Sequence, residues 1–172
     1  MSAVGLALSL AIAPPPACVR EATEALARGE AEVAARRGEA CHAEEGHAQG
    51  LLLASQAWLQ AGRLAHARLD AERFLALGTG SKSVRKVAEL VRDTATQRSG
   101  TAWLAVSPAA TGDAGTITAT RADPGWPTLR ARWDELGVDG DAATLVLDPG
   151  AWAVTIARPG FHERTIEVTC AE

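Results

Sequence analysis

The sequence predicts an α+β protein with segregated modules, in which antiparallel α-helical hairpins come first and a small antiparallel β-sandwich follows. Two observations predict this order. Up to about residue 98 the apolar residues recur every three or four positions, in segments separated by glycine. After Ser99 and Gly100 the spacing changes to alternation, which is typical of strands that bury one face. We therefore expect a helical domain at 18–98 and a sandwich domain at 101–172.

The chain begins with an uncharged apolar run, from Ala3 to Ala13, that is too short to span a bilayer and suits the core of a signal peptide. Two features count against this interpretation: no Lys or Arg precedes the run, and Pro14 directly follows one of the two possible cleavage points. A buried or disordered apolar N-terminus is the alternative. We expect a signal peptide at 1–17 and export to the periplasm or cell envelope.

Two of the three cysteines are placed to pair. Cys18 and Cys41 lie at almost equal distances from Gly29, where a turn between two helices is expected. Residues equidistant from the turn of an antiparallel hairpin lie side by side, so a disulfide is geometrically possible and would agree with an oxidising compartment. The alternative is two small buried residues that happen to be cysteines. Cys170 is left over and is expected to be buried near the end of the last strand.

Helices are expected at 18–28, 30–43, 47–61 and 63–77, and a further helix should follow an N-cap at Ser83. Glycines end the first and third of them, as glycines often do after a helix. The second helix is the weakest of the set, because it is rich in alanine and Gly38 interrupts it.

The order Trp58, Gly62, Ala67 resembles the tetratricopeptide repeat. The resemblance implies a helical hairpin in which the aromatic ring packs between the helices, the glycine makes the turn, and the small alanine allows close approach. Gly29 and Ala34 repeat the glycine-to-alanine spacing about one family period earlier. The family prefers other residues at several positions further along, and an unrelated alanine-rich helical bundle is the alternative.

Six strands are expected in the second half, at 101–108, 116–122, 128–133, 143–148, 151–158 and 161–170. In the fifth, Trp152, Val154 and Ile156 should face one way and the residues between them the other. The last strand alternates in the same manner. Strands of this kind pack on a single side, as in a small sandwich.

Two Pro-Gly pairs, Pro149-Gly150 and Pro159-Gly160, flank the fifth strand and suit type II turns. Because a type II turn twists the wrong way for a tight hairpin, either these loops are wider than two residues or the chain crosses between two sheets there. With Phe161 and the alternating strands, the pairs make segment 147–169 similar to the PEGA domain family, small β-sandwich modules of bacterial envelope proteins. Upstream the agreement is loose, and another small sandwich, such as a carboxypeptidase-regulatory-like module, is the alternative.

The sequence contains no catalytic fingerprint and no set of residues that would act together as acid, base and nucleophile. A net charge of −4 provides no basic surface for nucleic acid. Possible metal ligands gather between Cys41 and His47 and in the acidic segment at 134–141, but their spacing matches no known site, and both groups are expected to be solvated. We therefore expect no enzyme activity, no cofactor and no metal.

These observations favour a non-enzymatic exported envelope protein that acts as a protein–protein interaction or scaffolding module. Its partner would be another envelope protein or peptide, laid in a groove of the helical part. The alternative is a carbohydrate or cell-wall binding module. Its ligand would stack on Trp126, which is expected to be exposed in the segment "DPGWP".

Overall fold

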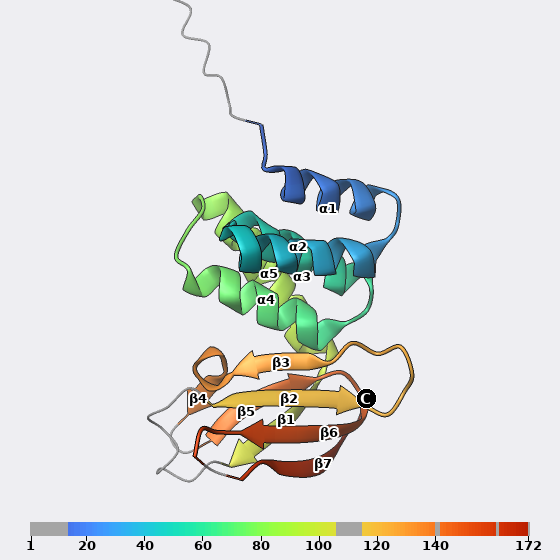
Figure 1. The fold of residues 1–172 in the computed structure, drawn as a ribbon, viewed down its shortest axis with the longest axis vertical. Coiled ribbons are helices and arrows are strands. Elements are labelled where there is room, and N and C mark those ends of the chain that lie inside the picture. The colour runs from blue at the N-terminus through green and yellow to red at the C-terminus, as the bar shows by residue number, and fades with distance from the viewer. Residues whose placement is uncertain (1–13, 106–114, 140–141, 161, 172) are drawn as a thin grey trace, which may run out of the picture.

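The computed structural model describes residues 14–105, 115–139, 142–160 and 162–171, and it shows two stacked modules (Figure 1). The helices of the first module are α1 (Ala17–Ala27), α2 (Ala31–Glu45), α3 (Ala48–Gln60), α4 (Leu64–Ala76) and α5 (Lys82–Arg98). In Figure 1, α4 is the helix that lies against the strands. Because α5 ends at Arg98 and β1 begins at Gly100, the modules meet where the spacing of apolar residues changes.

The second module is a β-sandwich of two antiparallel sheets, as predicted. The strands are β1 (Gly100–Ala105), β2 (Thr116–Arg121), β3 (Leu129–Arg132), β4 (Gly137–Asp139), β5 (Ala142–Leu147), β6 (Gly150–Ala157) and β7 (Arg164–Cys170). One sheet has the order β1-β5-β4 and the other β3-β2-β6-β7. A short 3-10 helix, η2 (Trp133–Glu135), follows β3. The sequence analysis missed β4, whose three residues are too few to show an alternating pattern.

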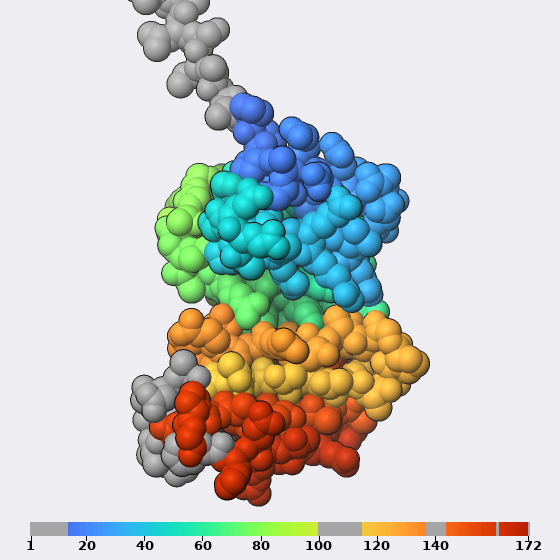
Figure 2. All heavy atoms as spheres, viewed as in Figure 1, coloured from blue at the N-terminus to red at the C-terminus, as the bar shows by residue number. Residues whose placement is uncertain are grey.

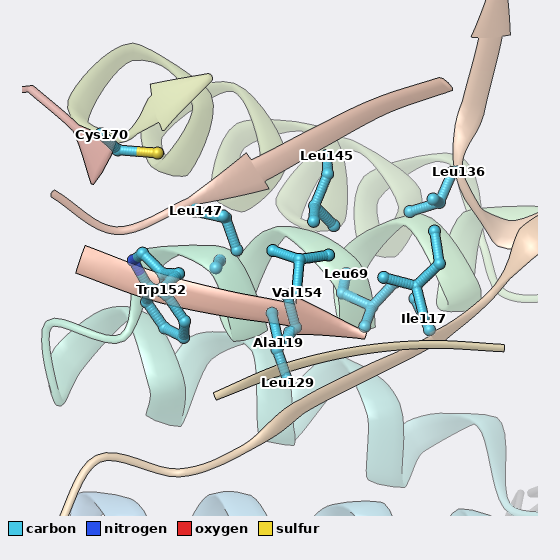
Figure 3. Close-up of a cluster of buried hydrophobic side chains, with 12 residues drawn as sticks. Leu69, Ile117, Ala119, Leu129, Leu136, Leu145, Leu147, Trp152, Val154 and Cys170 are labelled. Atoms are coloured by element: carbon cyan, nitrogen blue, oxygen red, sulfur yellow. The ribbon is translucent and has the colours of Figure 1, made fainter. Parts of the chain in front are cut away.

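The sandwich core lies between the two sheets, and α4 contributes to it. Leu145 and Leu147 of β5 pack against residues of the other sheet that include Ile117 and Val154 (Figure 3). Leu69 of α4 belongs to the same buried cluster. The helix therefore covers one side of the sandwich, so the two modules share a hydrophobic core along this line of contact.

The two Pro-Gly pairs make different connections, and each of the two predicted alternatives occurs once. At Pro149-Gly150 the chain crosses from β5 in one sheet to β6 in the other, and Gly150 adopts φ 135°. Pro159-Gly160 lies in a wider loop between β6 and β7 of the same sheet, and Gly160 has the φ of 81° that suits a type II turn. Phe161 lies outside the described residues.

The prediction that Gly38 interrupts the second helix is wrong. The helix is continuous from Ala31 to Glu45, and Gly38 lies where α2 and α3 approach most closely. A Cβ atom at Gly38 would lie 2.5 Å from the carbonyl oxygen of Gly50. The glycine is there because the backbones nearly touch. A smaller correction concerns α5, whose N-cap is Ser81 rather than Ser83: the Ser81 hydroxyl accepts a hydrogen bond from the Val84 N–H.

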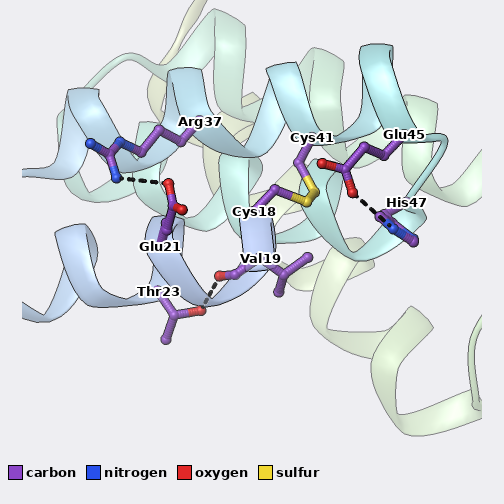
Figure 4. Close-up of a disulfide and its surroundings, with 8 residues drawn as sticks. All are labelled: Cys18, Val19, Glu21, Thr23, Arg37, Cys41, Glu45 and His47. Carbon is purple, nitrogen blue, oxygen red and sulfur yellow. Dashed lines mark hydrogen bonds and ion pairs between the residues drawn. A yellow bond between two sulfur atoms is a disulfide. The ribbon is translucent and has the colours of Figure 1, made fainter. Parts of the chain in front are cut away.

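A disulfide joins α1 to α2, as the spacing around Gly29 predicted. Cys18 and Cys41 are bonded, with their Cα atoms 5.5 Å apart (Figure 4). Cys170 is a free, buried cysteine at the end of β7, which also confirms the prediction. The signal-peptide prediction falls mostly on residues 1–13, outside the described part of the chain. Within the described part, none of the helices has the length and apolar character needed to cross a membrane.

Candidate functional site

The start of α4 is held by a side chain of the sandwich. Its N-cap residue, Arg63, has no capping side-chain bond, and Asp148 at the end of β5 supplies the cap instead. The Asp148 carboxylate accepts hydrogen bonds from the N–H groups of Leu64, at 2.8 Å, and Ala65, at 3.3 Å. Burial raises the pKa of Asp148, while these two donors oppose the shift. The module contact thus satisfies backbone donors that a helix start leaves open.

Trp126 makes a second contact between the modules, and its ring is less exposed than predicted. Its ring is partly buried, with the guanidinium carbons of Arg63 and Arg121 lying 3.9 Å and 4.1 Å from the ring centroid. The edge of the ring meets Trp152, with the centroids 6.3 Å apart. Arg63 also pairs with Glu32 of α2, at 2.6 Å. The π faces of Trp126 are therefore engaged in cation–π contacts, with Arg63 across the module boundary and with Arg121 within the sandwich.

Along its length, α4 covers the exposed edge of β3. In its sheet β3 is an edge strand, whose outward carbonyl groups lack a neighbouring strand. His66 Nε2 lies 3.3 Å from the carbonyl oxygen of Thr128, and Arg73 Nη2 donates to that of Arg130 at 3.0 Å. Arg73 also pairs with Glu135 of η2, at 2.9 Å. Side chains of α4 thus occupy acceptors that an added strand would need.

A cleft of about 1100 Å³ lies beside the contact between α4 and β3. Its floor is the side of α4 that carries His66, Asp70 and Arg73, together with Trp58 of α3. Its walls are α2 on one side and β3 with η2 on the other. Figure 2 shows the green surface of α4 recessed between the blue-to-cyan helices and the orange strand β3. The site is therefore composed of both modules and exists only while they are docked.

Two polar residues of α4 are buried at the floor of the cleft. Asp70 is 1% exposed and 3.3 Å from Arg73, and burial, followed by the negative charge of Glu39, raises its pKa well above the usual range. For His66, burial is the main cause that lowers the pKa to about 4, so the ring is neutral at neutral pH. Because Nε2 faces the Thr128 carbonyl, the proton resides there and Nδ1 is a bare acceptor.

Several buried polar atoms around the cleft have no hydrogen-bond partner in the described part of the chain. They are His42 Nδ1, His66 Nδ1 and Trp126 Nε1, and all three residues line the cleft. Asp70, also buried there, makes a side-chain hydrogen bond with Glu39, and this contact helps to raise the pKa of Asp70. Buried polar groups in folded proteins are normally satisfied, so a cluster of unpaired ones needs a physical reason. Ordered water in the cleft, or a bound molecule that supplies donors and acceptors, is such a reason.

The residues of the predicted helical packing signature lie in α3, in α4 and in the turn between them. Trp58 is almost fully buried, Ala67 is fully buried, and Gly62 makes the turn between α3 and α4 with φ 73°. The indole N–H of Trp58 donates to Glu39 at 2.8 Å, which brings a carboxylate of α2 to the cleft. Trp58 and His66 also have ring centroids 4.9 Å apart. The signature therefore lies directly beneath the candidate site.

The sequence analysis missed the polar floor of the cleft. His66, Asp70 and Arg73 recur at helical spacing on one face of α4, while Ala67, Ala71 and Phe74 on the adjacent face bury into the helical module. A helix with an apolar stripe and a short polar stripe normally turns the polar one to water. The helical spacing of these three polar residues is visible in the sequence. Only the structure shows that the sandwich covers them.

The possible metal ligands are largely engaged by protein groups. Cys18 Sγ lies within 4.8 Å of ligand atoms of Glu45 and His47, but its sulfur is bonded to Cys41 and is not a free thiolate. In the acidic segment, Asp134 pairs with Arg132 at 2.6 Å and Glu135 with Arg73. Residues 140–141 of that segment lie outside the described residues.

Comparison with known proteins adds no relative: no family model, curated protein or solved structure matches the chain. The tetratricopeptide and PEGA resemblances accordingly stay predictions. The candidate site is defined by its geometry alone, namely the cleft, its buried polar floor and the contacts that hold the two modules together.

Proposed function

We propose that this chain is a non-enzymatic, exported binding module that holds a segment of another envelope protein in the cleft between its two modules. The observation that carries the proposal is the set of unpaired buried polar atoms around a cleft of about 1100 Å³. His66, more than nine-tenths buried, is a member of this set. Water satisfies such groups in an open cleft, and a ligand that supplies the same hydrogen bonds can replace that water.

The shape and lining of the cleft favour a polypeptide segment. The floor follows α4, whose 13 residues extend over about 20 Å. Apolar side chains, among them Leu51 and Leu77, line the cleft together with polar ones, as in grooves that receive a peptide or helix. Because α4 already covers the β3 edge, recognition would use side chains in the groove rather than an added strand.

Binding accounts for the lining better than catalysis does. Among the described residues that line the cleft there is no Ser, Cys, Lys or Tyr, and Thr128 carries the one hydroxyl. His66 is neutral and its Nε2 faces a backbone carbonyl, and Asp70 is held beside Arg73. Glycan binding through Trp126 has less support than peptide binding, because two arginines already lie over the Trp126 ring.

Export is supported by the disulfide between Cys18 and Cys41, because disulfides form and persist in oxidising compartments. Fractionation of cells that make the protein tests this part. We expect the chain in the envelope fraction, and recovery in the cytosol with three free thiols would contradict export.

Site-specific photo-crosslinking tests the binding part. Ala43 is exposed and lines the cleft, whereas Ala40 is exposed on the same helix outside it. A photoreactive residue at Ala43 should form a discrete adduct with a protein in the producing cells, and the same residue at Ala40 should not. Adducts that are equal at both positions, or adducts with glycan alone at Ala43, would refute the proposal.

A further inference from the structure

The charged residues that line the cleft are unequally satisfied. Every acidic residue of the lining contacts a donor of the protein: Glu39 accepts from Trp58, Asp70 and Glu135 from Arg73, and Asp134 from Arg132. Two arginines of the lining, Arg36 and Arg130, have no ion-pair partner among the described residues. Two positive charges of the lining are therefore left without a counter-charge, against one negative charge, that of Glu39, whose donor is the neutral Trp58 indole.

These two arginines are on opposite walls of the cleft. Arg36 belongs to α2 and Arg130 to β3, and both are exposed. The floor between them is also under positive charge, because Arg63, Arg36 and Arg73 all act to lower the pKa of His66 there. A negative charge brought into this space is attracted from both walls. Glu39 is the one lining carboxylate without an arginine partner, and its bond to the Trp58 indole fixes its position.

We propose that the segment held in the cleft is acidic, with Asp or Glu carboxylates that Arg36 and Arg130 bind from the two walls. This inference rests on the proposed function and names the chemistry of its partner. Guanidinium groups bind carboxylates with paired, charge-assisted hydrogen bonds, so two arginines on facing walls fix both the position and the direction of a bound segment. Backbone N–H groups of the bound segment can donate to the acceptors of the floor, such as His66 Nδ1.

Selection from a library of random displayed peptides, each about as long as α4, tests the inference. The full chain is the target, and parallel selections use two tryptophan variants. Ala43→Trp fills the cleft from an exposed position, and Ala40→Trp is the matched control on the same helix. Peptides that bind the cleft should be recovered with the native chain and with Ala40→Trp, and lost with Ala43→Trp. We expect these cleft-dependent peptides to be enriched in Asp and Glu.

A second pair of variants assigns the acidic preference to its arginines. Arg36→Gln and Arg130→Gln should each weaken binding of a selected acidic peptide about fivefold, measured by fluorescence anisotropy. Arg20→Gln and Arg85→Gln are the controls and should leave binding unchanged. Both arginines are exposed, lie outside the cleft and have no ion pair within the described part of the chain. Far-ultraviolet circular dichroism checks that each variant is folded.

The outcomes separate the two proposals. Cleft-dependent peptides without acidic enrichment, or acidic peptides whose binding is unaffected by both Arg36→Gln and Arg130→Gln, would refute the acidic partner and leave the binding function standing. If every recovered peptide binds Ala43→Trp as well as the native chain, the cleft is not a peptide site and the proposed function fails.

Discussion

The two modules bury their apolar residues in different ways. In the buried cluster shared by the helices, eight of the eleven described residues are alanine, whereas only three of the twelve in the sandwich cluster are. Helices joined by alanine and glycine approach until their backbones almost touch, while sheets are held apart by large side chains that fill the space between them. The helical module should therefore be most sensitive to added atoms, and the sandwich to removed ones.

Removing the largest side chain of the sandwich core should have the largest effect. Trp152 is 2% exposed, and its indole N–H donates to the Asp148 carbonyl oxygen at 2.8 Å. Trp152→Ala should lower the free energy of unfolding by about 4 kcal/mol, because it leaves a cavity and an unpaired carbonyl. Urea denaturation measures the loss. Trp133→Ala is the control, since Trp133 is only partly buried, and an equal loss from both variants would contradict a core role for Trp152.

Adding one carbon to the helical module tests the opposite sensitivity. Gly38→Ala would place its Cβ 2.5 Å from the Gly50 carbonyl oxygen, so α2 and α3 must move apart. The expected loss is about 2 kcal/mol, although alanine is the better helix former in isolation. Arg37→Ala at the adjacent, exposed position should change stability by less than about 0.5 kcal/mol. A stabilised Gly38→Ala variant in thermal or urea denaturation would disprove the close approach.

Much of the fold could be predicted from the sequence because the apolar residues recur with a different period in each module. Three-to-four spacing located the helices, and alternation located every predicted strand, with Trp152, Val154 and Ile156 turned inward. The misreading of Gly38 has a physical cause. A glycine within a helix weakens it when judged locally, and only the position of a second helix reveals that the missing side chain is what permits contact.

The candidate site was much less predictable, because no single segment contains it. Its floor comes from α4 and its walls from α2 and β3, which are distant in sequence. His66, Asp70 and Arg73 look like an ordinary solvated stripe until the sandwich covers them. Trp126 shows the same limit from the other side: the turn "DPGWP" suggests exposure, but two arginines from separate elements lie over the ring.

The contact between the modules should respond to acid through His66. Its pKa is lowered from the usual 6.5 to about 4, so in that range the unfolded chain binds more protons and stability falls as the pH falls. Between about pH 7 and pH 5 this group should remove up to about 2 kcal/mol. Asp70, whose pKa is raised, acts in the opposite direction over its own range. The two effects therefore have to be separated by mutation.

His66→Gln makes that separation, because the glutamine amide can still donate to the Thr128 carbonyl but does not titrate. Over the same pH range, the free energy of unfolding measured with urea should fall less in this variant than in the native chain, by up to about 2 kcal/mol. His162→Gln, at an exposed position, is the control and should retain the native slope. Identical slopes in the native chain and His66→Gln would show that His66 is not desolvated by the module contact.

The smallest expected effect concerns the Asp148 cap that joins the modules, and it tests whether the sandwich stabilises the start of α4. Asp148→Asn retains one acceptor oxygen, but sets an amide N–H₂ against the N–H of Leu64 or Ala65, so we expect a loss of about 1 kcal/mol. Ser81→Ala removes a cap within the helical module and should cost a similar amount. Hydrogen exchange distinguishes them: only Asp148→Asn should speed exchange at the start of α4. Equal protection there in both variants would mean that the sandwich does not hold α4, and that the cleft does not depend on this cap.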